Sequence, residues 1–250
     1  MKFNERSPKM DISLTSKLRI VFQSEADQKS AYDTMTAYRD ACNYVSQYVF
    51  DHNFVLKQSE LQSALYHELR DRFGLKSQMA QSVFKTVIAR YKTVQTQLRK
   101  QRVWDGYKKD NHGKDVPNYI KKDLTFLWKP IEFKRPQVDL VRNRDYSFKN
   151  DMLSMNTING RVFVKVYGLE ENHYFDGSWK LGTGKVVRSG KHWFFHISVT
   201  KEVPDFEMKD LKHVVGIDRG LRQILTTYDE KGQTRFVNGA FISKKTQTLC

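Results

Sequence analysis

Residues 14–22 read Leu-Thr-Ser-Lys-Leu-Arg-Ile-Val-Phe, and this stretch decides how the rest of the chain is organised. Its apolar side chains recur at every second position, at Leu18, Ile20 and Phe22, which is the period of a half-buried strand. Residues 24–122, which follow it, have helical periodicity and offer it no neighbouring strand. The strand therefore most simply pairs with strands much later in the chain, which makes the helical block an insertion within a small β-barrel.

The helical block begins with a recognisable signal. Ser24 followed by Asp27 is a capping-box-like start, Gly74 is a natural helix stop, and a third helix is expected to begin near Ser77. Apolar residues at steps of three and four predict the buried stripes of three helices: Met35, Tyr38, Cys42, Val45 and Val49; Leu61, Leu65, Leu69 and Phe73; Val83, Val87, Tyr91, Val94 and Leu98.

From Leu124 onward the apolar period returns to two. Val162, Val164 and Val166 alternate with other side chains, and residues 194–200 and, more weakly, 181–187 follow the same pattern. Turn pairs such as Asn159-Gly160 and Ser189-Gly190 separate these segments. The chain is therefore predicted to be α+β, with a small antiparallel β-barrel and an inserted helical domain.

The composition favours a polyanionic partner. The chain has 250 residues with 43 Lys+Arg against 28 Asp+Glu, a formal charge of +15, and clustered cations gain affinity by releasing counterions from phosphates. The alternatives are a soluble protein that happens to be basic, and a membrane-surface protein. No stretch approaches the roughly 18 apolar residues of a membrane span. The N-terminus lacks an apolar signal region, so a cytoplasmic location is expected.

The densest charge lies in residues 99–149, which hold 14 Lys/Arg and 7 Asp/Glu with aromatic residues interleaved. Single-stranded nucleic acid needs this combination, since cations meet phosphates and flat rings meet bases. Any one cation could equally be a solvated charge, and half of the aromatics could be packing. The candidate nucleic-acid-binding residues are Lys85, Arg90, Arg99, Arg102, Trp104, Tyr107, Lys121, Lys122, Trp128, Lys134, Arg135, Arg142 and Arg144.

A carboxylate closes an apolar strand near the end of the chain. His213-Val214-Val215-Gly216-Ile217-Asp218 is followed by an Arg219-Gly220 turn and two predicted hairpin strands, which is how an RNase H-like nuclease fold begins. Such nucleases cleave phosphodiesters with two Mg²⁺ about 4 Å apart, and carboxylates are the ligands that Mg²⁺ prefers. Asp218 is therefore the candidate catalytic residue and metal ligand; the alternative is an ordinary turn residue.

Four groups of motifs follow one another along nearly the whole chain. They are Leu75–Gln81 with Val87 and Tyr91; Ile131–Lys134 with Asp139–Val141 and Asp145–Phe148; Leu153–Val162 and Trp193–Val199; and Val215–Gly220. In order and spacing they resemble the N-terminal part of the TnpB (OrfB) family, the transposon-encoded RNA-guided nucleases related to type V CRISPR effectors.

The resemblance implies a domain organisation and a set of partners. Residues 1–23 and 123–210 would form a wedge-like β-barrel, residues 24–122 a recognition domain, and residues 211–250 an incomplete RuvC (RNase H-like) domain. The implied partners are a guide RNA from the transposon end and double-stranded target DNA beside a short adjacent motif, in the setting of transposition. A monomer is the favoured oligomeric state.

The sequence also departs from the family. The later RuvC Glu and Asp and the Cys-x-x-Cys zinc ribbon have no counterpart among the 250 residues. We therefore expect no zinc, no stable binding of the two Mg²⁺ ions, and loss of DNA cleavage, as in a reading frame cut short or predicted only in part. The alternatives are a non-catalytic, repressor-like nucleic-acid-binding protein and a decayed transposase fragment.

Overall fold

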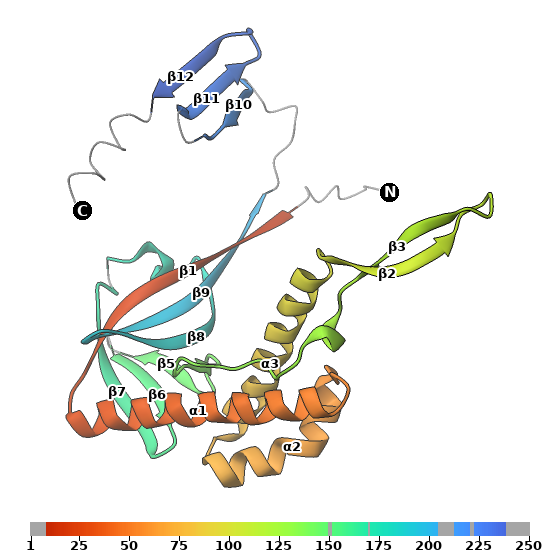
Figure 1. Ribbon diagram of the computed structural model, residues 1–250. Coiled ribbons are helices and arrows are strands. Elements are labelled where there is room, and N and C mark those ends of the chain that lie inside the picture. Colours follow the sequence, from red (N-terminus) through yellow and green to blue (C-terminus); the bar gives the residue numbers. More distant parts are fainter. Residues whose placement is uncertain (1–8, 150–151, 170, 205–212, 221–222, 239–250) are drawn as a thin grey trace, which may run out of the picture. The chain divides into compact units, whose positions relative to one another are not determined.

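The computed structural model describes residues 9–149, 152–169, 171–204, 213–220 and 223–238 (Figure 1). The chain divides into two compact units, residues 11–201 and residues 202–250 with 1–10. The elements are β1 (Lys9–Phe22), α1 (Glu25–Asp51), α2 (Gln58–Phe73), α3 (Ser77–Leu98), β2 (Arg102–Lys109), β3 (Asp115–Lys121), η1 (Leu124–Phe126), β4 (Val138–Leu140), β5 (Tyr146–Lys149), β6 (Met152–Thr157), β7 (Gly160–Tyr167), η2 (His173–Phe175), β8 (Lys180–Ser189), β9 (His192–Pro204), β10 (Val215–Asp218), β11 (Gln223–Asp229) and β12 (Thr234–Asn238).

The first strand lies in the middle of a seven-stranded antiparallel sheet, in the order β4-β8-β9-β1-β7-β6-β5, which curls into a nearly closed barrel. Arg19 is paired with Tyr167 and Phe22 with Val164. The predicted long-range pairing of this strand is therefore confirmed, as is the α+β class. The strand begins at Lys9, earlier than the predicted residues 14–22, and the apolar alternation continues back through Ile12 to Met10.

The start of α1, the end of α2 and the start of α3 lie where local chemistry predicts. The Ser24 hydroxyl accepts a hydrogen bond from the Asp27 amide at 3.1 Å and caps α1. Gly74 ends α2 with a φ of +63°, a left-handed conformation that costs glycine little. The predicted apolar stripe of α1 is buried from Met35 to Val49, so these side chains, Cys42 among them, form core.

The barrel and the helices share one hydrophobic core. On β7 the buried side chains are Val162, Val164 and Val166, as the alternation predicts. Phe195 of β9 meets Tyr146 of β5 at a ring-centroid distance of 4.9 Å, a contact that fills the barrel interior.

The packing of the barrel explains why residue 184 is a glycine, which the sequence alone did not reveal. A Cβ at this position would lie 1.9 Å from Cζ of the Phe195 ring, so glycine lets the ring pack directly against β8. The predicted turn pairs also form: Asn159 lies in the turn between β6 and β7, and Gly190 follows β8 with a φ of +58°.

The helical period ends earlier than the sequence pattern suggested. Residues 102–109 and 115–121 form a two-stranded hairpin, β2–β3, and no helix. Val103, Val116 and Ile120 favour strands, and Gly113 turns the chain with a φ of +76°. The Asp110 side chain holds this turn by accepting from the amides of His112 and Lys114. This hairpin extends beyond the end of α3 (Figure 1).

The second unit contains a three-stranded antiparallel sheet in the order β10-β11-β12. Asp218 ends β10 and is paired with Thr226. The predicted strand–hairpin arrangement is therefore present. Residues 239–250, which include Cys250 and the end of the predicted RuvC segment, lie outside the described residues, as do residues 211 and 212.

Candidate nucleic-acid interface

A basic groove runs along one face of α3. Lys85, Thr86, Ala89, Arg90 and Thr93 recur at helical spacing and line it, and Phe133, Gln137, Asp139 and Lys185 line its opposite side. Helix α3 presents Lys85 and Arg90 on this side because its buried residues, such as Val87 and Tyr91, face the core. Two predicted cations thus lie in one groove with Lys185, a cation from the barrel.

A second hollow adjoins the first, since both are lined by Gln137 and Lys185. It adds Arg135 and Arg188, whose guanidinium lies 5.6 Å from the ring centroid of Tyr32. The two hollows together, called here the basic track, are lined by five cations: Lys85, Arg90, Arg135, Lys185 and Arg188.

The one carboxylate of the basic track is already engaged. Asp139 lies 3.2 Å from the Lys185 ammonium and accepts a hydrogen bond from the Thr86 hydroxyl at 2.8 Å. Lys185 is also hydrogen-bonded to the side chain of Gln137 at 3.3 Å. These contacts hold Lys185 in place within the track, and the remaining cations leave an electropositive surface that attracts phosphate.

Lys185 and Arg188 were not among the predicted contacts. They belong to β8, whose alternation is weak, and nothing in their local sequence separates them from other exposed cations. Lys185 comes beside Lys85 and Arg90 because β8 pairs with β4, which contacts α3, and Arg188 lines the adjoining hollow. No signal in the sequence could have found this arrangement without the fold.

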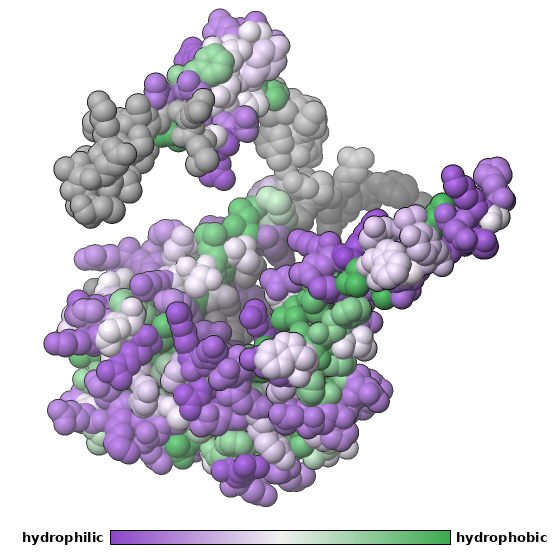
Figure 2. Space-filling model, viewed as in Figure 1, coloured by the Kyte–Doolittle hydropathy of each residue, from purple (hydrophilic) through white to green (hydrophobic). Residues whose placement is uncertain are grey.

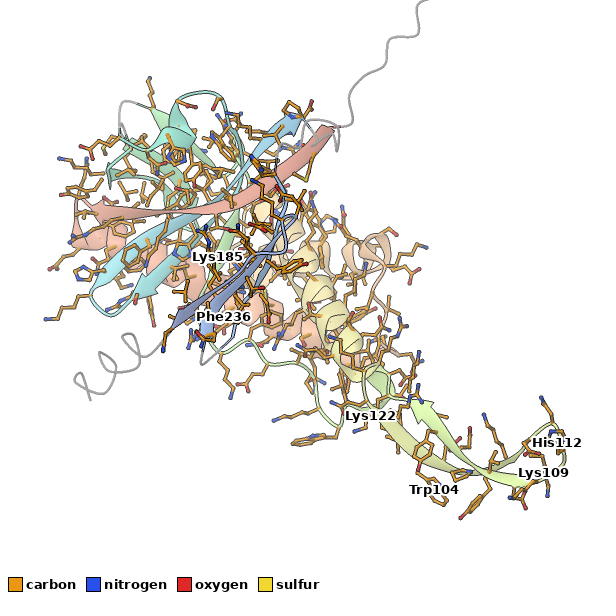
Figure 3. All side chains as sticks on the ribbon, turned by 90° about the horizontal axis from the view of Figure 1, so that it is seen from above. Trp104, Lys109, His112, Lys122, Lys185 and Phe236 are labelled. Atoms are coloured by element: carbon orange, nitrogen blue, oxygen red, sulfur yellow. The ribbon has the colours of Figure 1, made fainter. Side chains whose placement is uncertain are left out.

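A second group of predicted residues gathers on the β2–β3 hairpin. Arg102, Trp104 and Tyr107 lie on β2, Lys121 ends β3, and the Lys122 amide donates to the Gln101 carbonyl at 3.1 Å and closes the base. Arg99 caps α3 just before the hairpin. Figure 3 labels Trp104, Lys109, His112 and Lys122 along this projection, and Figure 2 shows its surface as mostly hydrophilic with paler side chains among the purple ones.

The other predicted contacts are dispersed. Trp128 is 82% exposed with the Lys129 ammonium 4.6 Å from its ring centroid, and Lys134 is exposed on the following loop. Arg144 donates to the Gln78 side chain at 2.7 Å, which gives it a structural contact to α3. Arg142 lines a separate pocket with His173 and Phe148. These four residues extend neither the track nor the hairpin.

Asp218 does not belong to a metal-binding cluster among the described residues. They contain no group of three His, Cys, Asp or Glu side chains placed to hold an ion. Glu230, at the opposite end of the β10–β11 pair from Asp218, accepts from the His213 ring at 2.8 Å and from the Val214 amide, and the hydrogen bond from His213 lowers the pKa of its carboxyl. Among the described residues, Asp218 alone therefore does not supply the ligands of a two-Mg²⁺ centre.

Among known proteins, the chain is similar only to solved structures found by comparison of folds. No protein-family model matches the chain, and no curated protein matches it. The solved structures that it resembles include Cas12f complexes. The CRISPR-Cas12f ternary complex has a TM-score of 0.48 at 9% identity, covering 90% of this chain and 51% of that one. The Cas12f1–sgRNA–target DNA complex has a TM-score of 0.44 at 10% identity, covering 96% and 68%.

The chain thus spans about half the length of the Cas12f chain in the ternary complex. Within the described part of this protein, none of the helices has the length and apolar character that crossing a bilayer demands.

Proposed function

We propose that this protein is a TnpB/OrfB-like RNA-guided DNA-binding protein, whose basic track holds the backbone of a guide RNA or of a guide–target duplex. The observation that carries the proposal is the convergence of cations from α3, the loop residue Arg135 and β8 on two adjoining hollows. Recognition through a duplex backbone requires such an array, because base pairing, rather than the protein, then reads the sequence.

The motifs add the finer part of the proposal. The stretches that resemble TnpB motifs include Ile131–Lys134 and Asp139–Val141, which border the basic track. The RuvC-like assignment of residues 211–250 rests on the Val215–Gly220 motif and on the strand order that follows it. Guide RNA and double-stranded target DNA are the proposed partners.

The first experiment measures the affinity for a structured RNA over a range of salt concentrations. Lys85 and Arg90 are replaced together by Gln. If they contact phosphates, affinity falls and the slope of log affinity against log salt becomes shallower by about one for each lost contact.

A matched variant controls for net charge. Lys29→Gln with Lys57→Gln removes the same charge from exposed side chains that pair with Asp33 and Glu60 outside the track. Retained affinity in this control supports the track. An equal loss of RNA affinity in both variants would show that the protein attracts RNA only through its overall charge. RNA affinity that does not change with salt concentration would contradict the electrostatic argument.

The RNA-guided part has its own test. The protein is expressed with a guide RNA of defined sequence and purified, and its retention of double-stranded DNA is measured for matching and scrambled targets. The proposal requires retention of the matching target alone. Equal retention of both targets would instead indicate a non-guided nucleic-acid-binding protein. Asp218→Ala is expected to leave RNA affinity unchanged, because an anionic side chain outside the track makes no phosphate contact.

A further inference from the structure

The β2–β3 hairpin has two chemically different faces, which its register defines. Directly paired residues share a face, and the successive pairs Arg102–Lys121, Trp104–Tyr119, Tyr107–Pro117 and Lys109–Asp115 all lie on the same side. The pairs Val103–Ile120 and Lys108–Val116 lie on the other. One face is therefore aromatic and cationic, and it is called here the aromatic face; the other is mainly aliphatic.

A β-bulge creates the aromatic face. Trp104 and Tyr107 are three residues apart, an odd spacing that places side chains on opposite faces of a regular strand. Here the register shifts between them, so that Asp105 and Gly106 together oppose Asn118, and both rings come to one side. Their centroids are 6.0 Å apart at 85°. Gly106 adopts a φ of +79°, and the Asn118 side-chain amide donates a hydrogen bond to the Asp105 carboxylate at 3.2 Å.

The aromatic rings are held out into solvent. Trp104, Tyr107 and Tyr119 are 57%, 68% and 57% exposed, and none of residues 102–121 is buried. Aromatic residues usually bury most of their surface, and a two-stranded hairpin gains little stability on its own. Three exposed rings on one face, two of them aligned by a bulge, therefore indicate a ligand-binding surface rather than packing.

The charges around the aromatic face indicate an anionic ligand. Residues 99–122 hold eight Lys or Arg and three Asp, and the acids are engaged: Asp105 with Asn118, Asp110 with the turn amides, and Asp115 with Lys109 at 2.9 Å. Arg102 and Lys121 are paired directly across the hairpin. Neither makes an ion pair with a described residue. Like charges in this position repel each other, and an anion between them would remove that repulsion.

We propose that the aromatic face is a stacking platform for unpaired nucleotides of a single-stranded segment. Bases stack on Trp104, Tyr107 and Tyr119, and a phosphate lies between Arg102 and Lys121. Cations beside sequence-tolerant stacking rings are the combination that single-stranded nucleic acid requires. The site is separate from the basic track, so it can be tested whatever the outcome for the track.

The test compares oligonucleotides with and without bases. The full-length protein is titrated with a short unpaired oligonucleotide and with an abasic one of equal length, which keeps the phosphates but removes the stacking partners. The normal oligonucleotide is expected to bind more tightly. Trp104→Ala and Tyr119→Ala should each weaken it by about fivefold or more while leaving abasic binding unchanged. RNA and DNA versions identify which kind of strand the platform prefers.

Two matched pairs of variants make the test specific to one face. Lys121→Gln and Lys108→Gln remove the same charge from opposite faces, and only the first is expected to weaken binding. Trp104→Ala is compared with Ile120→Ala in the same way.

The proposal is overturned if normal and abasic oligonucleotides bind equally, or if the two faces respond equally to substitution. It is also overturned if Trp104→Ala abolishes self-association while leaving oligonucleotide binding intact, since the face would then contact a second copy of the chain. If the Lys85→Gln and Arg90→Gln double variant keeps its RNA affinity while the platform variants behave as expected, the result counts against the proposed function alone.

Discussion

The Thr86 hydroxyl on α3 donates a hydrogen bond to the Asp139 carboxylate on β4 at 2.8 Å. Because the single proton of Thr86 is used in this way, Tyr38 of α1 must donate to the Thr86 oxygen, at 2.8 Å. Burial, reinforced by the negative charge of Asp139, raises the pKa of Tyr38 well above its usual range and keeps it a donor. Two helices and the barrel are thereby joined beneath the basic track.

Asp139→Ala is expected to destabilise the protein by about 1–3 kcal/mol, because it leaves the Thr86 hydroxyl without its acceptor. Asp139→Asn keeps an acceptor oxygen and should cost less. Denaturant unfolding measures both variants. Equal losses for the two would show that the ion pair with Lys185, which both variants lack, contributes more than the hydrogen bond.

Gly184→Ala should destabilise the barrel by about 1–3 kcal/mol or more, since the added methyl group overlaps the Phe195 ring. Thermal unfolding measures the effect. Phe195→Leu is destabilising by itself but makes room, so the double variant should lose less than the sum of the two single changes. Strict additivity would show that the ring and the methyl group do not meet.

His196 on β9 should make stability sensitive to acid. Burial, with the nearby charges of Lys17 and Lys185, lowers its pKa below the usual 6.5, and its Nε2 is buried without a hydrogen-bond partner. A depressed folded-state pKa contributes stability that is present above the unfolded value and is lost as pH falls through the folded one. His196→Gln should therefore flatten the loss of stability below about pH 6.5.

Unfolding midpoints measured from neutral to acidic pH test this expectation. His192 provides the control, because it is exposed on the same strand. If His192→Gln flattens the profile as much as His196→Gln does, burial of His196 is not the cause.

Ser24→Ala is expected to destabilise the protein by about 1 kcal/mol through loss of the cap of α1. Ser24→Asp retains an acceptor for the Asp27 amide and should cost little. Helix content by circular dichroism and the denaturation midpoint provide the measurement. A full effect in the Asp variant would contradict the capping explanation.

Features that depend on near neighbours in the chain were predictable. Ser24 and Gly74 bound their helices because caps and left-handed turns are satisfied within one turn of the backbone. The stripe from Met35 to Val49 is buried because its spacing matches the helical repeat. The pairing of the first strand with strands late in the chain was also predictable, since an isolated strand must find partners elsewhere; the structure supplies which strand, β7.

The β2–β3 hairpin was not predicted from the sequence, because each of its turn and strand signals is weak by itself. Asp110 and Gly113 mark a turn, but Trp104 and Tyr107 have a spacing that a helix also allows. Only the bulge at Asp105 and Gly106 brings the two rings onto one face of a strand, and a bulge depends on pairing with the opposite strand.

The sequence by itself determined the basic charge, the α+β class, the start of α1, the end of α2 and the position of Asp218 at the end of a strand, because these follow from composition and local periodicity. Only the tertiary structure decided which cations act together. Lys85 and Lys185 are far apart in the chain and line one groove because β8 pairs with β4 beside α3. Residues that are far apart in the sequence become neighbours in space through packing and strand register, and no local sequence pattern encodes either.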